Sequence, residues 1–197
     1  MEIKKYGKFN PTGTSDKKHQ IILVNTSRSI HPYLQTLKYR YNGKFTRIPN
    51  YIITRTGDIL ELLEPLNYSQ YFNDSSMDQN SIVISFENLG WIQREPLTDY
   101  YVNWIGDIYK GEVYEKKWRD YYFWQPYTTQ QVDSCVELCN ILFKELSIKN
   151  NIIGHNTKIN YNPKYEGVLT FSNIDKERTD VSPAFNFEQL IKKIENE

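Results

Sequence analysis

Gln20-Ile21-Ile22-Leu23-Val24-Asn25 is an unbroken apolar run that ends in a polar residue. The run is too short for a helix and is rich in branched side chains, so it predicts a buried strand. Asn25 then lies at the end of this strand.

Apolar patterns, together with turn and capping residues, predict further strands and helices along the chain. Residues 50–63 hold two apolar segments around a Thr-Gly-Asp turn, which is typical of a β-hairpin, and residues 81–87 (SIVISFE) predict another strand. The clearest helix begins at Thr128 or Thr129, because Thr128 and Gln131 form a capping box ahead of a one-sided apolar pattern. Weaker patterns indicate a helix within 33–41, a short strand at 151–155, irregular structure up to about 182 and a last helix at about 186–194.

Composition limits the class of protein. The 197 residues carry 24 Lys and Arg against 24 Asp and Glu, so the formal net charge is zero and no global field attracts nucleic acid. A hydrophobic content of 39% suffices for a core and argues against general disorder. We expect one domain over 1–197, with an N-terminal extension at 1–19 and an aromatic-rich insertion at 96–127.

The sequence also predicts where the protein resides. No run approaches the roughly 18 apolar residues of a membrane span, and the first twenty residues lack the apolar centre of a signal peptide. We therefore expect a cytoplasmic protein without a signal peptide. Cys135 and Cys139 lie one helical turn apart, and we expect both to be reduced core residues.

Tyrosine and tryptophan are concentrated in residues 96–127. One interpretation is an inserted subdomain whose aromatic side chains cover a sheet edge and fill a local core. The other is an exposed stacking surface for sugar rings or a protein partner, since Tyr and Trp combine a large contact area with a polar group. Trp104 and Trp118 are the candidate ligand-binding residues of this segment.

Of the three histidines, His155 is the most informative. It follows an apolar strand and a glycine, where a side chain is presented at the end of a sheet. A hydrogen-bonded loop histidine is the alternative. His19 lies in a charged stretch and His31 precedes a proline in a loop, which makes both less suited to catalysis.

The order of these pieces resembles the type 2 N-acetylmuramoyl-L-alanine amidases, a fold shared with peptidoglycan recognition proteins. The matching segments are 23–26 (LVNT), 51–57 (YIITRTG), 80–88 (NSIVISFEN), 153–156 (IGHN) and 178–185 (RTDVSPAF). The resemblance covers roughly residues 20–190. It implies an α/β fold with a mixed central β-sheet flanked by helices.

The resemblance also implies a catalytic zinc held by three protein ligands with an open fourth position. The second and third ligands match His155 and Asp180, whereas Asn25 occupies the first position. A carboxamide is a poor substitute for imidazole, so bound zinc is doubtful and the site is degenerate. His31, six residues after Asn25, is a possible replacement ligand.

At the other positions of the implied site, some residues have the side-chain chemistry that the family uses and others do not. The family's assisting tyrosine or glutamate matches Pro49, which transfers no proton. Arg178, or the adjacent Lys176, matches the basic residue that stabilises the developing oxyanion. Glu87 ends a strand beside the cleft, where it is either a general base or a structural acceptor of loop amides. Tyr51 and Asn156, within the matching segments, are further candidate ligand-binding residues.

Two hypotheses of different classes follow. The first is an amidase, or a descendant of one, that cleaves the muramoyl-L-alanine bond of peptidoglycan; the absent signal peptide and the composition suit a phage-encoded enzyme acting from the host cytoplasm or a virion. The second is an inactive amidase fold reused to bind a muropeptide, another small ligand or a protein partner. Neither involves nucleic acid or a membrane span.

Overall fold

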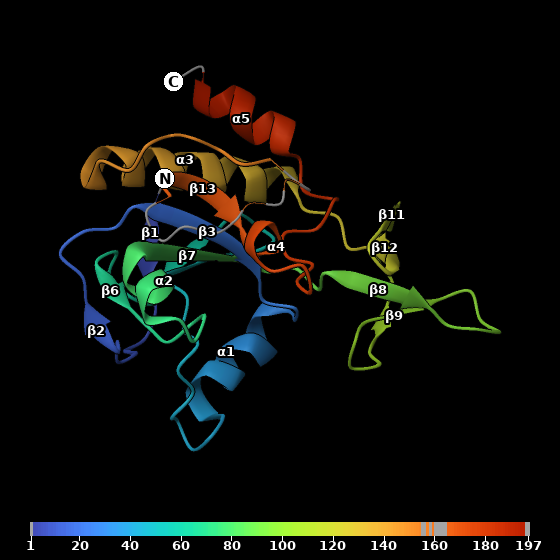
Figure 1. Cartoon of the computed structure of the whole chain (residues 1–197). Helices are drawn as coiled ribbons and strands as arrows, with labels where there is room; N and C mark the ends of the chain where they lie inside the picture. Colours follow the sequence, from blue (N-terminus) through green and yellow to red (C-terminus); the bar gives the residue numbers. More distant parts are fainter. Residues whose placement is uncertain (1, 155–156, 158, 160–164, 196–197) are drawn as a thin grey trace.

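A computed structural model describes residues 2–154, 157, 159 and 165–195. Its centre is a six-stranded sheet with the strand order β1-β5-β4-β7-β3-β13 (Figure 1). These strands are β1 Ile3–Lys5, β3 Gln20–Asn25, β4 Tyr51–Ile53, β5 Ile59–Glu61, β7 Ser81–Phe86 and β13 Gly167–Thr170. All pairs are parallel except the β4–β5 hairpin, so the sheet is mixed. The predicted fold class is thereby confirmed.

Helices cover both faces of this sheet. α3 (Thr129–Leu146) and α5 (Phe187–Glu195) pack on one face, and α1 (Ile30–Tyr39) and α2 (Ser75–Asn80) lie on the other (Figure 1). Along β3, Ile21 and Leu23 enter the core beneath α3, whereas Ile22 and Val24 enter a core on the opposite face. Burial on both faces explains why this strand is apolar without alternation.

The predicted cap of α3 is present and also connects the helix to the sheet. Thr128 Oγ1 accepts a hydrogen bond from Gln131 N at 3.1 Å, and Gln131 Oε1 accepts one from Thr128 N at 3.2 Å. Gln131 Nε2 then donates to the carbonyl oxygens of Ile53 and Glu87. The capping residue thus joins α3 to the ends of β4 and β7. Cys135 and Cys139 are free and buried in this helix, as expected.

A second, antiparallel sheet of five strands extends to one side of the central sheet (Figure 1). Its order is β10-β9-β8-β12-β11, with β8 Trp91–Arg94, β9 Tyr101–Val102, β10 Ile108–Tyr109, β11 Tyr114–Trp118 and β12 Tyr121–Trp124. Trp118 and Trp124 are buried in it, while Trp104, Tyr114 and Tyr122 are exposed. The aromatic segment therefore contains both a local core and an exposed surface.

Three local predictions need correction. Residues 3–5 of the expected extension form β1, a polar edge strand that pairs with β5. Within 151–154 only an isolated bridge, Ile152 to Val168, replaces the expected short strand. The region expected to be irregular contains β13 and α4 (Phe171–Ile174). The sequence also did not predict the antiparallel pair of strands β2 (Gly13–Thr14) and β6 (Asn67–Tyr68).

Lys18 is a buried cation just before β3. Its Nζ donates to the carbonyl oxygen of Asp78 at 3.3 Å and lies 5.4 Å from the centre of the Tyr68 ring. Burial lowers the pKa of Lys18 to about 8, and the negative charge of Asp78 only partly opposes this shift. The folded protein therefore releases this proton at a lower pH than the unfolded chain does.

We expect Lys18→Met to flatten the pH dependence of stability in the alkaline range. Because the pKa is lowered in the folded state, the unfolded chain binds more protons above pH 8, and wild-type stability gains about 2 kcal/mol from this group between pH 8 and pH 10. Urea unfolding at both pH values, compared between wild type and variant, measures this gain. Lys17→Met, at an exposed position, is the control; an equal pH dependence in Lys18→Met and wild type would contradict the prediction.

Candidate functional site

A cavity of about 320 Å³ lies where the carboxyl end of β3 meets the second sheet. Its polar side consists of Asn25 and Ser27 together with residues 177–180. Its aromatic side consists of Trp91 and Tyr121, from strands β8 and β12 of the second sheet, and Trp104, from the turn between β9 and β10. The cavity therefore lies between Asn25 at the end of β3 and the aromatic segment.

Asn25 is held in one orientation by Tyr127. The Tyr127 hydroxyl accepts a hydrogen bond from Ser182 N at 3.3 Å and donates to Asn25 Oδ1 at 2.6 Å. Burial raises the pKa of Tyr127 above its usual range, so this hydroxyl keeps its proton. Since the backbone N–H of Ser182 can only donate, it does not compete with Asn25 Oδ1 for the tyrosine proton. The Nδ2 amide is the Asn25 group nearest to Gly90, on the cavity wall.

Asp180 is the acidic group beside Asn25. Its Oδ2 accepts a hydrogen bond from the Asn25 backbone N–H at 3.4 Å. Burial raises the pKa of Asp180, while the positive charges of Arg178 and Arg119 oppose that rise. Arg119, from the turn between β11 and β12, also donates to the carbonyl oxygen of Ser172 at 3.0 Å. The second sheet thus contributes a cation to the surroundings of Asp180.

Arg178, and not Lys176, lines the cavity. Its guanidinium lies 4.8 Å from the centre of the Phe171 ring, and its Nε is 3.8 Å from an Asp175 carboxylate oxygen. Lys176 is exposed and pairs with Glu177. Of the two basic candidates, Arg178 is therefore the one placed to contact a ligand.

The described residues do not fit a zinc site. Asn25 Oδ1, the one donor atom that this position offers a metal, already accepts the Tyr127 proton, and an amide nitrogen is not an ordinary zinc ligand. Within the described part of the chain, His, Cys, Asp and Glu side chains form no group of three or more that could hold a metal ion. The predicted ligand His155 and the predicted contact residue Asn156 lie outside the described residues.

Glu87 makes the contacts of a structural acceptor, one of the two roles predicted for it. Oε1 accepts a hydrogen bond from Ile30 N at 2.8 Å, and Oε2 accepts one from Arg55 N at 2.9 Å. Both carboxylate oxygens are therefore used to hold the start of α1 and the β4–β5 turn. Glu87 is also not among the residues that line the cavity.

Two candidate ligand-binding residues are core residues instead. Tyr51 is only 2% exposed, packs in the core beneath α3 and directs its hydroxyl to Glu61. Trp118 is 7% exposed, and its ring lies 5.6 Å from that of Trp124, with the Arg119 guanidinium over it. Side chains buried in this way are unavailable to a ligand. Trp104, in contrast, is 43% exposed and lines the cavity.

His31 is not a replacement ligand in this structure. It lies on the exposed side of the first turn of α1 and does not line the cavity. His19 is near Glu166, with Nδ1 3.8 Å from its carboxylate, just before β3 starts. Pro49, near the position that the resemblance assigns to the assisting residue, is buried just before β4.

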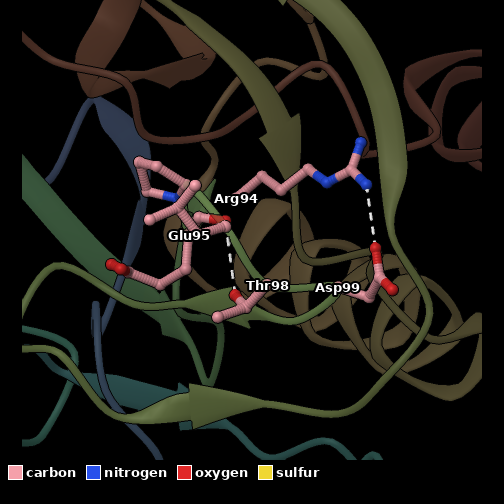
Figure 2. Close-up of a pocket in the computed structure, with 6 residues that line it drawn as sticks. Arg94, Glu95, Thr98 and Asp99 are labelled. Carbon is pink, nitrogen blue, oxygen red and sulfur yellow. Dashed lines mark hydrogen bonds and ion pairs between the residues drawn. The ribbon is translucent and has the colours of Figure 1, made fainter.

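A second hollow, of about 380 Å³, is formed by six consecutive residues, 94–99, at the turn between β8 and β9 (Figure 2). Arg94 pairs with Asp99 at 3.1 Å, and the Thr98 hydroxyl donates to the Glu95 carbonyl oxygen. Both side chains of the ion pair are largely exposed. A single solvated turn of this kind lacks the converging walls of a ligand site.

Sequence reasoning missed Tyr127 and Arg119, which shape the polar side of the cavity. Tyr127 reaches Asn25 across 102 positions of the chain. Its place directly before the capping box of α3 is the one signal that could have pointed to it. Arg119 carries no such signal, because it lies between aromatic residues in a segment without a clear period.

Comparison with known proteins identifies the family. The family model described as N-acetylmuramoyl-L-alanine amidase matches residues 15–166, so the chain belongs to this family. No curated protein is similar enough in sequence to count as a match.

Solved structures share the fold. The N-acetylmuramoyl-L-alanine amidase LysC from Clostridium intestinale URNW superposes with a TM-score of 0.59 at 13% identity, over 99% of this chain and 98% of that one. The amidase AmiD from E. coli, in complex with its anhydro-muramoyl tripeptide substrate, gives 0.56 at 14% identity over 94% of this chain. This chain spans 60% of the length of AmiD. AmpDh3 from Pseudomonas aeruginosa, in complex with an anhydromuramic pentapeptide, gives 0.54 at 11% identity, over 95% and 63% of the two chains.

Proposed function

We propose that this protein binds a muropeptide in the cavity beside Asn25 without hydrolysing it through a zinc ion. The observation that carries this proposal is the hydrogen bond from Tyr127 to Asn25 Oδ1. It leaves the Nδ2 amide, a hydrogen-bond donor, as the free group of Asn25. A hydrogen-bonding site therefore takes the place of a metal-binding one.

The polar side of the cavity suits the chemistry of a muropeptide. Asn25 Nδ2 and the Arg178 guanidinium donate to carbonyl or carboxylate oxygens, while the Asp180 carboxylate accepts an amide N–H. Burial of Asp180 strengthens such hydrogen bonds, because water competes less for them. The solved structures of AmiD and AmpDh3, each in complex with a muropeptide, support this ligand class by analogy of fold.

The amidase alternative rests on Asp180 and Arg178, which the resemblance places in the catalytic set and which lie in one cavity.

Within the described residues, no helix has the length and apolar character needed to cross a bilayer. A phage origin, a cytoplasmic location and a protein partner stay predictions from the sequence.

Titration calorimetry with N-acetylmuramoyl-L-alanyl-D-isoglutamine tests the proposal. We expect binding that is unchanged by EDTA, and no release of the dipeptide by mass spectrometry with or without added zinc. Asn25→Ala should weaken binding at least about tenfold, as expected for loss of a central contact. Thermal unfolding of this variant checks that it is folded, since the buried Tyr127 hydroxyl loses its acceptor.

Asn10→Ala, at an exposed position outside the cavity, is the matched control and should bind like wild type. Zinc-dependent release of the dipeptide would contradict the proposal and support the amidase alternative. Absence of any binding would contradict it as well.

A further inference from the structure

The aromatic side of the cavity has no role in the polar contacts described above. Trp91 and Tyr121 come from strands of the second sheet and Trp104 from its β9–β10 turn, whereas the polar groups come from the end of β3, the loop after it and the loop that precedes α5. A cavity with one aromatic and one polar side fits a ligand with an apolar face and polar edges.

Trp104 is fixed in place although it is exposed. Its indole Nε1 donates to the Ser27 carbonyl oxygen at 2.7 Å, and the Arg28 guanidinium lies 5.0 Å from the ring centre. These contacts tie the second sheet to the loop that follows Asn25. An exposed ring that is already ordered loses little conformational entropy when a ligand packs against it.

The turn that carries Trp104 is itself rigid. Asn103 Oδ1 accepts hydrogen bonds from Ile105 N at 3.1 Å and Asp107 N at 2.9 Å, and Asn103 Nδ2 donates to the Asp107 carboxylate at 3.2 Å. The Asn103 side chain is buried, whereas its partner Asp107 is exposed. This network presents Trp104 at a constant position on the turn.

The neighbouring part of the aromatic side is also pre-formed. Trp91 and Tyr121 stack with ring centres 4.7 Å apart and an interplanar angle of 17°. Tyr121 further contacts the fully buried Trp124 edge-on. The rings that line the cavity are therefore anchored to the core of the second sheet.

We propose that Trp104, supported by Trp91 and Tyr121, forms a stacking wall for a pyranose ring, so that the protein selects ligands with an amino sugar over free peptides. The apolar C–H face of the sugar packs on the indole, and its hydroxyl and acetamido edges remain available to polar groups and water. This inference rests on the proposed function for the peptide part of the ligand, but the sugar wall itself is independent of it.

Three probes test the wall by calorimetry: N-acetylmuramoyl-L-alanyl-D-isoglutamine, the free dipeptide L-alanyl-D-isoglutamine, and tri-N-acetylchitotriose. We expect wild type to bind both sugar-containing probes more tightly than the dipeptide. Trp104→Ala should weaken both at least about tenfold and leave dipeptide binding unchanged. Trp104→Phe keeps a flat ring and should retain more affinity than Trp104→Ala, which separates stacking from a folding defect.

Tyr122→Ala is the matched control, because Tyr122 is 48% exposed on β12 and does not line the cavity. Equal affinity of Trp104→Ala and wild type for the muropeptide would overturn the sugar wall and leave the proposed function intact. Trp104-dependent binding of the chitotriose without any muropeptide binding would overturn the proposed function alone. Binding of none of the probes would overturn both.

Discussion

Asn25→His is expected to raise the affinity of the protein for zinc by at least about 100-fold. An imidazole supplies the ligand type that zinc prefers, at the strand end where a carboxamide now stands. Loss of even an outer partner of a metal ligand costs 10–100-fold in affinity, so restoration of a direct ligand should gain no less. Titration calorimetry of the metal-stripped wild type and variant measures the difference.

The design of this experiment depends on the contact between Asn25 and Asp180 at 3.4 Å. The double variant Asn25→His/Asp180→Asn should lose the gain, because it removes the carboxylate from the restored set. Ser27→His, which adds an imidazole elsewhere on the cavity lining, controls for adventitious binding. If zinc binds wild type and Asn25→His equally, Asn25 does not occupy a ligand position and the interpretation of the site is wrong.

The elements that the sequence predicts well are those buried on a sheet face or a helix face. β3, β7 and α3 each place their apolar residues in the cores, so their patterns follow directly from burial. β1 is missed because an edge strand with the sequence Ile-Lys-Lys faces solvent and carries no apolar pattern. β11 is missed because charged residues interrupt its aromatic pattern, and β9 and β10 because each is only two residues long.

The candidate site is predictable only in part for a related reason. The order of motifs predicts that Asn25 and Asp180 share one site, and in the structure Asp180 Oδ2 lies 3.4 Å from the backbone nitrogen of Asn25. The orientation of the Asn25 carboxamide is set by Tyr127, which is distant in the chain and belongs to no matching motif. A sequence motif specifies which residue stands at a position. The hydrogen-bond partners of that residue decide whether its side chain offers a ligand a lone pair or a proton.

Glu87→Ala is expected to lower the free energy of unfolding by about 3–6 kcal/mol. Glu87 accepts the backbone N–H groups of Ile30 and Arg55 through separate oxygens, and hydrogen bonds to a charged group contribute about 1.5–3 kcal/mol each. The first fixes the N-terminal residue of α1, whose Ser29 cap makes no side-chain hydrogen bond. Removal of the carboxylate therefore leaves the backbone N–H groups of Ile30 and Arg55 without this acceptor.

Chemical denaturation by urea, followed by circular dichroism, measures this loss. Glu87→Gln should fall between wild type and Glu87→Ala, because the amide retains one acceptor oxygen and turns the other position into a donor. Glu137→Ala, on the exposed side of α3, is the matched control and should change stability by less than about 0.5 kcal/mol. A wild-type stability for Glu87→Ala would contradict the structural role, and if muropeptide binding or cleavage were lost at the same time, the carboxylate would act on the ligand instead.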